Sequence, residues 1–420
     1  MHGQELRIPA CQMYFPYAGS IITVNPLLLS YFTATSCIGV GLDETLRTLR
    51  EGACGLTPCD FETVDLNTYT GSVPAVEEER IRDDLRDYDC RNNRLAQLGL
   101  RQDGFDGAVR AAVKRLGRDR VGVFLGTSTS GILQTEQAYR RRDPLTGALP
   151  ADFIYGTTQN SFSVTDFVRR YFDVGGPAMV VSTACSSGAK IFGSARRMIE
   201  AGVIDAAVVG GVDSLCLTTL YGFNSLELVS SRPCRPFDAG RDGLSIGEAA
   251  AFILVERAPD RPDPGDLVLV GFGESSDAYH MSSPHPEGHG ATLAMEKALA
   301  AAGLEPGDID YINLHGTATA TNDAAEGAAV SKLFGSSIPC SSTKGATGHA
   351  LGAAGGLEAV ISALAIKSGL MPGGVNCTHP DPFIAVNYLT ANRHQAITRV
   401  LSNSFGFGGT NCSLILGRAV

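Results

Sequence analysis

One cysteine stands where the chain can turn a thiol toward a substrate. Cys185 closes the segment 182–185 (Ser-Thr-Ala-Cys), where a β-branched run ends and a helical pattern begins. A helix N-terminus presents unpaired N–H groups and a partial positive charge, so it stabilises a thiolate and lowers the pKa of the thiol. Cys185 is therefore a candidate nucleophile, although a cysteine in such a place is also commonly a small buried hydrophobic residue.

Two histidines occupy comparable places in the second half of the sequence. His315 begins a His-Gly-Thr segment at the end of a short β-rich run, and His349 ends a Thr-Gly-His segment before an apolar helix. A single histidine there is more often a hydrogen-bonded structural residue. A thiol and two imidazoles at strand ends can instead converge on one substrate carbonyl, as nucleophilic catalysis with proton transfer requires. We take that convergence as the hypothesis.

Two charged residues lie close to these histidines in the sequence. Lys344 precedes His349 by five residues, and Glu358 is the only charge within the apolar run 350–366. A buried lysine needs a carboxylate partner or a shifted pKa. For Glu358, a buried ion pair with a residue such as Lys344 and a catalytic role both remain open.

The glycine-rich segment 405–409 (Phe-Gly-Phe-Gly-Gly) offers backbone N–H groups. Glycine tolerates unusual backbone angles, so these groups can point inward and form an oxyanion hole. The segment does not follow a strand and open a helix in the manner of a dinucleotide fingerprint. We therefore expect no nucleotide cofactor.

An approximate internal repeat supplies the elements that position these residues. Segments 120–131 and 310–320 each read as a short β-rich run that ends in a Gly-Thr-small-Thr loop. Each is followed by a second strand-to-helix switch: 179–185 leads into a helix that ends near Gly202, and 339–349 leads into the apolar helix that ends at Gly369. Both halves close with β-rich runs broken by Gly-Gly, at 205–214 and 400–416.

This alternation predicts an α/β protein with parallel β-α-β units in two similar halves. The strands must be covered on both faces, so the halves should share helices packed between their sheets. We place the first half at 30–258 and the second at 265–420, separated by the proline-rich segment 259–264. Residues 1–29 are expected to be an N-terminal extension.

Composition excludes several other classes of protein. The chain has 420 residues, 44% hydrophobic and 19% charged, with a net charge of −10 and no basic block longer than Arg140–Arg142, so nucleic acid is not an expected partner. Eleven cysteines without a C-x-x-C pair fit a reducing cytoplasm. The run 350–366 carries Glu358, which favours a buried core helix over membrane insertion. No metal is expected, because prolines and Gly288 prevent the helix that would align His285 with His289.

Four motifs occur in an order and spacing typical of one family: Thr183-Ala-Cys185-Ser-Ser, His315-Gly-Thr-Ala-Thr319, Lys344-Gly-Ala-Thr-Gly-His349 and Asn403-Ser-Phe-Gly-Phe-Gly-Gly-Thr-Asn411. With them the chain, from about residue 30 to 417, resembles the β-ketoacyl-acyl-carrier-protein synthases on the elongating (type I/II) branch of the thiolase superfamily. The resemblance implies a thiolase fold, in which duplicated α/β halves form a layered αβαβα sandwich. It also implies decarboxylative Claisen chemistry on substrates carried by the phosphopantetheine of acyl carrier protein, with no other cofactor.

The resemblance assigns a role to each motif residue. Cys185 would accept the acyl group, and the backbone N–H groups of Cys185 and Phe407 would hold the oxyanion. His315 and His349 would hydrogen-bond the malonyl thioester carbonyl. The remaining roles are supporting: an ion pair of Lys344 with Glu358, bracing carboxylates at Asp323 and Glu326, and a Phe407 side chain that gates acyl access.

The resemblance also implies the partners: acyl carrier protein, and a second subunit in a homodimer or in a heterodimer with a chain-length-factor-like protein. Two alternatives differ in their site residues. A catalytically silent chain-length-factor-like subunit lacks the cysteine, and a thiolase or initiating synthase uses a second cysteine or an asparagine in place of His349. Ala320, where the family commonly has proline, bears on substrate choice. Fatty acid, polyene or pigment, and polyketide pathways would share every motif.

Overall fold

Two sets of five strands follow the same order in the computed structural model, which describes residues 26–419. The first set runs β6 (Ala178–Val181), β5 (Val121–Gly126), β7 (Ala206–Asp213), β9 (Ala249–Arg257) and β1 (Leu27–Ser36). The second runs β12 (Pro339–Ser341), β11 (Tyr311–Asn313), β16 (Arg399–Gly406), β17 (Thr410–Arg418) and β10 (Leu267–Ser276). In each set the first three strands are parallel and the last two pair antiparallel. The predicted duplication is therefore confirmed.

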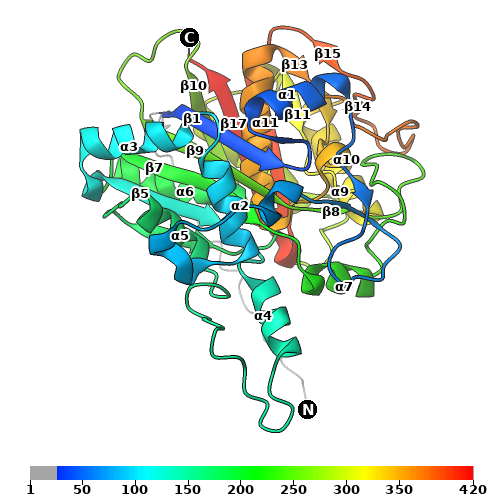
Figure 1. Ribbon diagram of the computed structural model, residues 1–420. Helices are drawn as coiled ribbons and strands as arrows, with labels where there is room; N and C mark the ends of the chain where they lie inside the picture. Colours follow the sequence, from blue (N-terminus) through cyan, green and yellow to red (C-terminus); the bar gives the residue numbers. More distant parts are fainter. Residues whose placement is uncertain (1–25, 420) are drawn as a thin grey trace, which may run out of the picture.

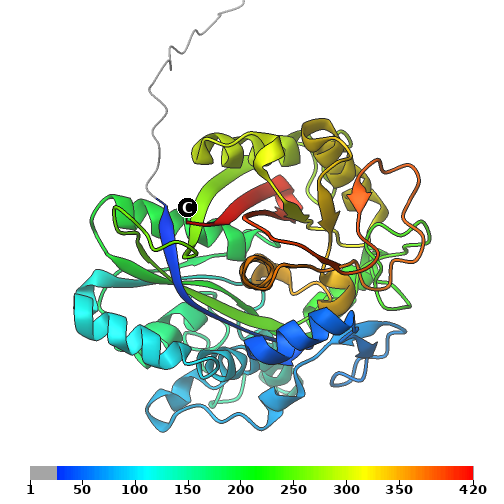
Figure 2. The ribbon, with the colours of Figure 1, turned by 90° about the horizontal axis from the view of Figure 1, so that it is seen from above.

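A short antiparallel contact joins the two halves. Leu27 and Leu28 of β1 pair with Leu269 and Val268 of β10, so the two sets form one continuous sheet, which β14 (Asn387–Tyr388) extends beyond β12. Seen from above, the sheet bends around a helix that is viewed end-on near the centre of the molecule (Figure 2). That helix is α11 (Ala354–Ser368).

Two helices fill the space between the halves. Helix α6 (Ser187–Glu200) packs on β5 and β7, α11 packs on β9 and β16, and the two helices pack on each other (Figure 1). They approach closely: a Cβ on Gly188 would lie 2.7 Å from the Gly352 oxygen and 2.9 Å from the Gly356 nitrogen. The prediction of shared helices is confirmed, and small residues make their contact possible.

Other helices cover the outer faces, which completes the layered arrangement. In the first half these are α2 (Arg91–Leu100), α3 (Phe105–Leu116) and α5 (Ser163–Tyr171), and in the second half α8 (His289–Ala302) and α9 (Ala320–Phe334). The remaining helices and strands are β2 (Gly39–Val40), α1 (Leu42–Glu51), β3 (Thr57–Pro58), β4 (Tyr69–Gly71), α4 (Ile132–Arg140), α7 (Leu217–Ser225), β8 (Ile246–Gly247), α10 (Lys344–Thr347), β13 (Leu370–Met371) and β15 (Arg393–His394).

The apolar helix belongs to the core. The stretch Leu351–Ser368 is long and apolar enough to cross a membrane, but 89% of it is buried inside the protein. Helix α11 ends where predicted, with Gly369 in the left-handed conformation at its C-cap. The core-helix prediction is thus confirmed.

Two features of the structure differ from the predictions made from the sequence. In the predicted repeat, the run 400–416 corresponds to the run 205–214 of the first half, which forms the single strand β7. The run 400–416 forms two strands instead, because residues 407–409 turn the chain back from β16 to β17. At the N-terminus, β1 begins at Leu27, inside the segment expected as an extension. Residues 1–25 of that segment lie outside the described residues.

Candidate active site

Cys185 sits in a tight turn between β6 and α6. The preceding residue, Ala184, has φ of +52°, a conformation uncommon for a residue with a Cβ. Side-chain hydrogen bonds hold the turn: the Thr183 N–H donates to Ser187 Oγ at 2.8 Å, and Ser186 Oγ donates to the Thr183 oxygen at 2.9 Å. The turn places the buried Cys185 thiol just ahead of α6.

His315 lies past the carboxyl end of β11, where a buried carboxylate fixes its backbone. The N–H groups of His315 and Gly316 donate to the two oxygens of Glu326, each at 2.8 Å. Asn403 Nδ2 also donates to Glu326, at 3.1 Å. Burial raises the pKa of Glu326 to about 7. Glu326 thus holds the loop that carries the imidazole, because its hydrogen bonds go to backbone N–H groups and to Asn403.

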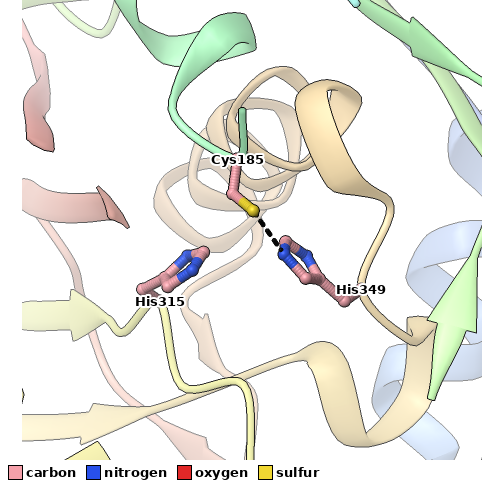
Figure 3. Close-up of side chains that lie close together, drawn as sticks. All are labelled: Cys185, His315 and His349. Atoms are coloured by element: carbon pink, nitrogen blue, oxygen red, sulfur yellow. Dashed lines mark hydrogen bonds between the residues drawn. The ribbon is translucent and has the colours of Figure 1, made fainter. Parts of the chain in front are cut away.

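His349 follows α10 and is tied to β8. Its N–H donates to the Ser245 oxygen at 2.7 Å, and its own oxygen accepts from Gly247 N–H at 3.1 Å. From this position its Nε2 atom lies 2.9 Å from Cys185 Sγ (Figure 3). Cys185 therefore meets a residue from the other half of the fold.

The two imidazoles and the thiol converge. The ring centroids of His315 and His349 are 5.3 Å apart, and the interplanar angle is 84°. The Cys185 sulfur and one nitrogen of each ring lie within 4.8 Å of one another, and Figure 3 shows all three side chains directed toward a common space. One substrate carbonyl can reach all three groups.

Lys344 and Glu358 form a buried ion pair, the first of the two possibilities that the sequence left open. Lys344 Nζ contacts Glu358 Oε1 and the backbone oxygen of His315, and it lies 3.3 Å from His315 Nδ1. Both side chains are almost fully buried. Burial raises the pKa of Glu358 to about 7, although the ammonium group opposes that rise. The pair holds an ammonium donor against the Nδ1 atom of His315.

The pKa of the Cys185 thiol differs from the one predicted from the sequence. The helix N-terminus predicted a lowered pKa, but burial raises the pKa of Cys185 to about 12, because desolvation outweighs the Lys344 charge and the Phe407 N–H. Burial, and then the Lys344 charge, holds the pKa of both histidines well below the usual value. At neutral pH the site therefore contains a neutral thiol beside neutral imidazoles, and His349 Nε2 accepts the thiol proton when the ring proton of His349 is on Nδ1.

Phe407 brings a backbone donor to the sulfur. Its N–H favours negative charge on the Cys185 sulfur, as does the N–H of Cys185 itself. Gly406 makes the approach possible, since a Cβ there would lie 2.9 Å from the Thr183 oxygen and 3.2 Å from the Cys185 nitrogen. The Phe407 ring packs against the ring of Phe223, with the two ring centroids 5.6 Å apart. Two N–H groups thus face the place where an oxyanion would form.

A pocket opens over these groups. Cys185, His315 and His349 are among the residues that line it. Part of its lining is apolar and is formed by Phe223, Leu228, Leu244 and Phe405. Another part carries hydroxyl groups, those of Ser282, Thr317, Thr319 and Thr321. Such a pocket suits a substrate with an apolar chain and a polar arm.

Two further buried carboxylates support the site from behind. Asp323 accepts the N–H of Phe237 at 2.8 Å and of Ala318 at 3.2 Å, so it braces the backbone of the loop after His315. Asp213, which sequence reasoning missed, accepts five hydrogen bonds at 2.7–3.1 Å, from residues 127–129 and Ala353. The signal for Asp213 is a charged residue at the end of an apolar run, where it is the last residue of β7.

The comparisons with known proteins agree with one another. The chain matches "Beta-ketoacyl synthase, N-terminal domain" over residues 32–261 and "Beta-ketoacyl synthase, C-terminal domain" over residues 267–378. It is 39% identical over 317 residues to 3-oxoacyl-[acyl-carrier-protein] synthase 2 of Coxiella burnetii, covering 71% of this chain and 75% of that protein. It is 32% identical over 433 residues to the mitochondrial 3-oxoacyl-[acyl-carrier-protein] synthase of Arabidopsis thaliana, covering 90% of each.

A solved structure shares the fold. It is the ketosynthase (ApeO) in complex with its chain length factor (ApeC) from Xenorhabdus doucetiae, with a TM-score of 0.84, 37% identity, and coverage of 94% of this chain and 98% of that one. The thiolase fold expected from the motifs is thereby confirmed. With two matched domains and relatives that align over most of their length, the chain belongs to the β-ketoacyl synthase family of condensing acyltransferases.

Proposed function

We propose that the protein elongates an acyl chain carried on acyl carrier protein. The acyl group moves to the Cys185 thiol as a thioester and releases the carrier thiol. Malonyl-acyl carrier protein then loses CO₂, and the resulting enolate attacks the Cys185 thioester. The products are β-ketoacyl-acyl carrier protein and a free Cys185 thiol. The observation that carries this proposal is the 2.9 Å contact between Cys185 Sγ and His349 Nε2, beside a second neutral imidazole.

In the acyl-transfer step, His349 acts as the base. Its Nε2 takes the thiol proton as the sulfur attacks the acyl carbonyl, and the proton then passes to the departing carrier thiol. The N–H groups of Cys185 and Phe407 hold the negative charge that develops on the carbonyl oxygen. The buried thiol needs this base, because its pKa of about 12 leaves little thiolate at neutral pH.

In the decarboxylation step, the two imidazoles act as donors. Lys344 Nζ donates toward His315 Nδ1, so the ring proton of His315 belongs on Nε2, the atom available to the substrate. Once Cys185 is acylated, His349 no longer faces a thiol proton and its Nε2 can carry the ring proton. Both Nε2–H groups then hydrogen-bond the malonyl thioester oxygen and stabilise the enolate left by CO₂.

The two alternatives are not favoured. A silent chain-length-factor-like subunit would lack the cysteine, whereas Cys185 is present and lies against an imidazole. A thiolase or initiating synthase would not have His349 at its position in this site. The relatives that align with most of this chain are named 3-oxoacyl-[acyl-carrier-protein] synthase.

We further propose that the protein works as a dimer in the cytoplasm. Within residues 26–419 the edge strand β6 pairs on one side only, with β5, and leaves a free edge for a second chain. Helix α4 and the loop after it extend away from the body (Figure 1), with Tyr155 60% and Leu145 95% exposed. A second copy or a chain-length-factor-like subunit would cover these surfaces. Native mass spectrometry, alone and after coexpression with such a subunit, distinguishes the two.

The test of the proposed function is reconstitution. The purified protein is incubated with acyl- and malonyl-loaded acyl carrier protein, and the carrier-bound products are identified by mass. We expect a β-ketoacyl product with one CO₂ released per condensation. Loaded carriers that remain unchanged, with saturated and unsaturated acyl chains alike, would overturn the proposal.

A further inference from the structure

Three cysteines that lie outside the catalytic site surround the short helix α10, which carries Lys344 and leads to His349. Helix α10 holds Lys344 at its start and leads through Gly348 to His349. Cys234 Sγ donates to the Lys344 oxygen at 3.1 Å, Cys54 Sγ to the Gly345 oxygen at 3.4 Å, and Cys37 Sγ to the Thr347 oxygen at 3.4 Å. Three backbone carbonyls along this turn therefore accept from thiols, and that of Lys344 also accepts from Gly348 N–H at 2.8 Å.

The last carbonyls of a helix have no partner within the helix and need one when buried. Here the carbonyl of Ala346 accepts from Gly55 N–H at 3.0 Å and also from Cys37 Sγ at 3.7 Å. Asn376 Nδ2 reinforces Cys54 by donating to the same Gly345 oxygen at 2.8 Å. All four carbonyls of α10 thus accept from the segments at 37, 54–55, 234 and 376.

The three thiols differ in their exposure: Cys234 is buried and Cys37 is partly buried. Burial raises the pKa of Cys37 above the usual range and that of Cys234 to about 12, so both remain S–H donors at neutral pH. Cys54, in contrast, is exposed. A reagent in solution can reach Cys54 directly, from outside the pocket that contains Cys185.

We propose that Cys37, Cys54 and Cys234 form a thiol cap that holds Lys344 and His349 in place, and that Cys54 is the point at which a small disulfide can act on the cap. The Cys54 thiol gives up its proton, the thiolate attacks one sulfur of the disulfide, and a new S–S bond forms; the other half leaves as a thiolate and takes up a proton to become a thiol. Cys54 is oxidised and the departing half is reduced. The Gly345 oxygen loses its S–H donor and meets a bulky adduct, so α10 shifts and His349 moves from Cys185.

Substitutions test the cap first. The readout is the initial rate at which iodoacetamide alkylates Cys185 in molecules whose Cys54 is still unmodified, followed by fragmentation of the intact protein. This rate depends on His349 and needs no carrier protein. We expect Cys54→Ala to slow it by about two- to fivefold, as fits the loss of one weak hydrogen bond. Cys54→Ser, which keeps an O–H donor, should restore it. Cys59→Ala is the matched control, since the Cys59 thiol donates no hydrogen bond to α10 and its removal should leave the rate unchanged. Equal rates for Cys54→Ala and the wild type would overturn the cap.

Glutathione disulfide then tests the modification site. Peptide mass mapping should find glutathione on Cys54, the alkylation of Cys185 should slow by more than in Cys54→Ala, and dithiothreitol should reverse both changes. Cys54→Ser should resist the treatment. If Cys54→Ser responds as the wild type does, the site is wrong. The inference depends on the proposed function only for its effect on turnover: altered Cys185 alkylation without any condensation product would retain the cap and reject the function.

Discussion

The Nε2 atom of His349 lies 2.9 Å from the Sγ atom of Cys185, and the two residues come from opposite halves of the duplicated fold. Neither half alone contains both the nucleophile and its base. The close packing of α6 on α11, through Gly188 and Gly356, brings the halves together at this point. A condensing site thus results from the duplication itself.

Replacing His349 by alanine should block decarboxylation of malonyl-acyl carrier protein. The enolate oxygen loses one of its two imidazole donors, and general acid–base groups of this kind contribute about 10²- to 10⁴-fold. The measurement is CO₂ release from malonyl carrier protein, with circular dichroism to check the fold. Release at the wild-type rate would exclude the assigned role.

The reactivity of Cys185 should rise steadily with pH. A pKa raised to about 12 means that the thiolate fraction increases about tenfold per pH unit up to at least pH 10. Alkylation by iodoacetamide, followed at the Cys185 peptide from pH 6 to pH 10, should therefore show no plateau. A plateau reached near pH 7 would show instead that a thiolate–imidazolium pair exists at rest.

Glu358→Gln should destabilise the protein and slow condensation together. The substitution leaves the Lys344 charge buried without its counter-charge, which costs about 3 kcal/mol. The ammonium group would also lose its fixed position beside His315. Denaturant unfolding measures the first effect and product formation the second. Asp152→Asn removes one member of an exposed pair with Arg141 and serves as the control, with almost no expected change. Unchanged stability for Glu358→Gln would contradict the ion pair.

Gly406→Ala should impair acyl transfer. The added Cβ would press on the Thr183 oxygen and the Cys185 nitrogen, and it would move the Phe407 N–H away from the sulfur. Losing one oxyanion donor costs about 10²- to 10³-fold in rate. Gly222→Ala in α7 is a matched control, because a Cβ there meets nothing within 4 Å. Acylation of the Gly406 variant within twofold of the wild-type rate would remove Phe407 from the oxyanion hole.

The local features of the fold were readable from the sequence because local chemistry determines them. Gly202 ends α6 as predicted: its N–H and that of Val203 donate to the oxygens of Ile199 and Met198, and its φ is +71°. Likewise the β-branched run before Cys185 forms β6. These features depend on residues close in the chain.

The features that sequence reasoning missed depend on distant residues. The donors to Asp213 come from loops about 85 and 140 positions away, so no local pattern shows that this carboxylate has five partners. The raised pKa of Cys185 follows from burial by both halves, which outweighs the helix N-terminus that the sequence reveals. The sequence shows 400–416 as a β-rich run broken by Gly-Gly, and the pairing of β16 with β17 across that break is seen only in the structure.

The central claim is that Cys185 carries the acyl group. The most direct test is the intact mass of the protein after incubation with acyl-loaded acyl carrier protein. We expect one acyl group on the wild type, mapped to Cys185, and none on a folded Cys185→Ala variant. A Cys185→Ala protein that is still acylated to full stoichiometry would contradict the account.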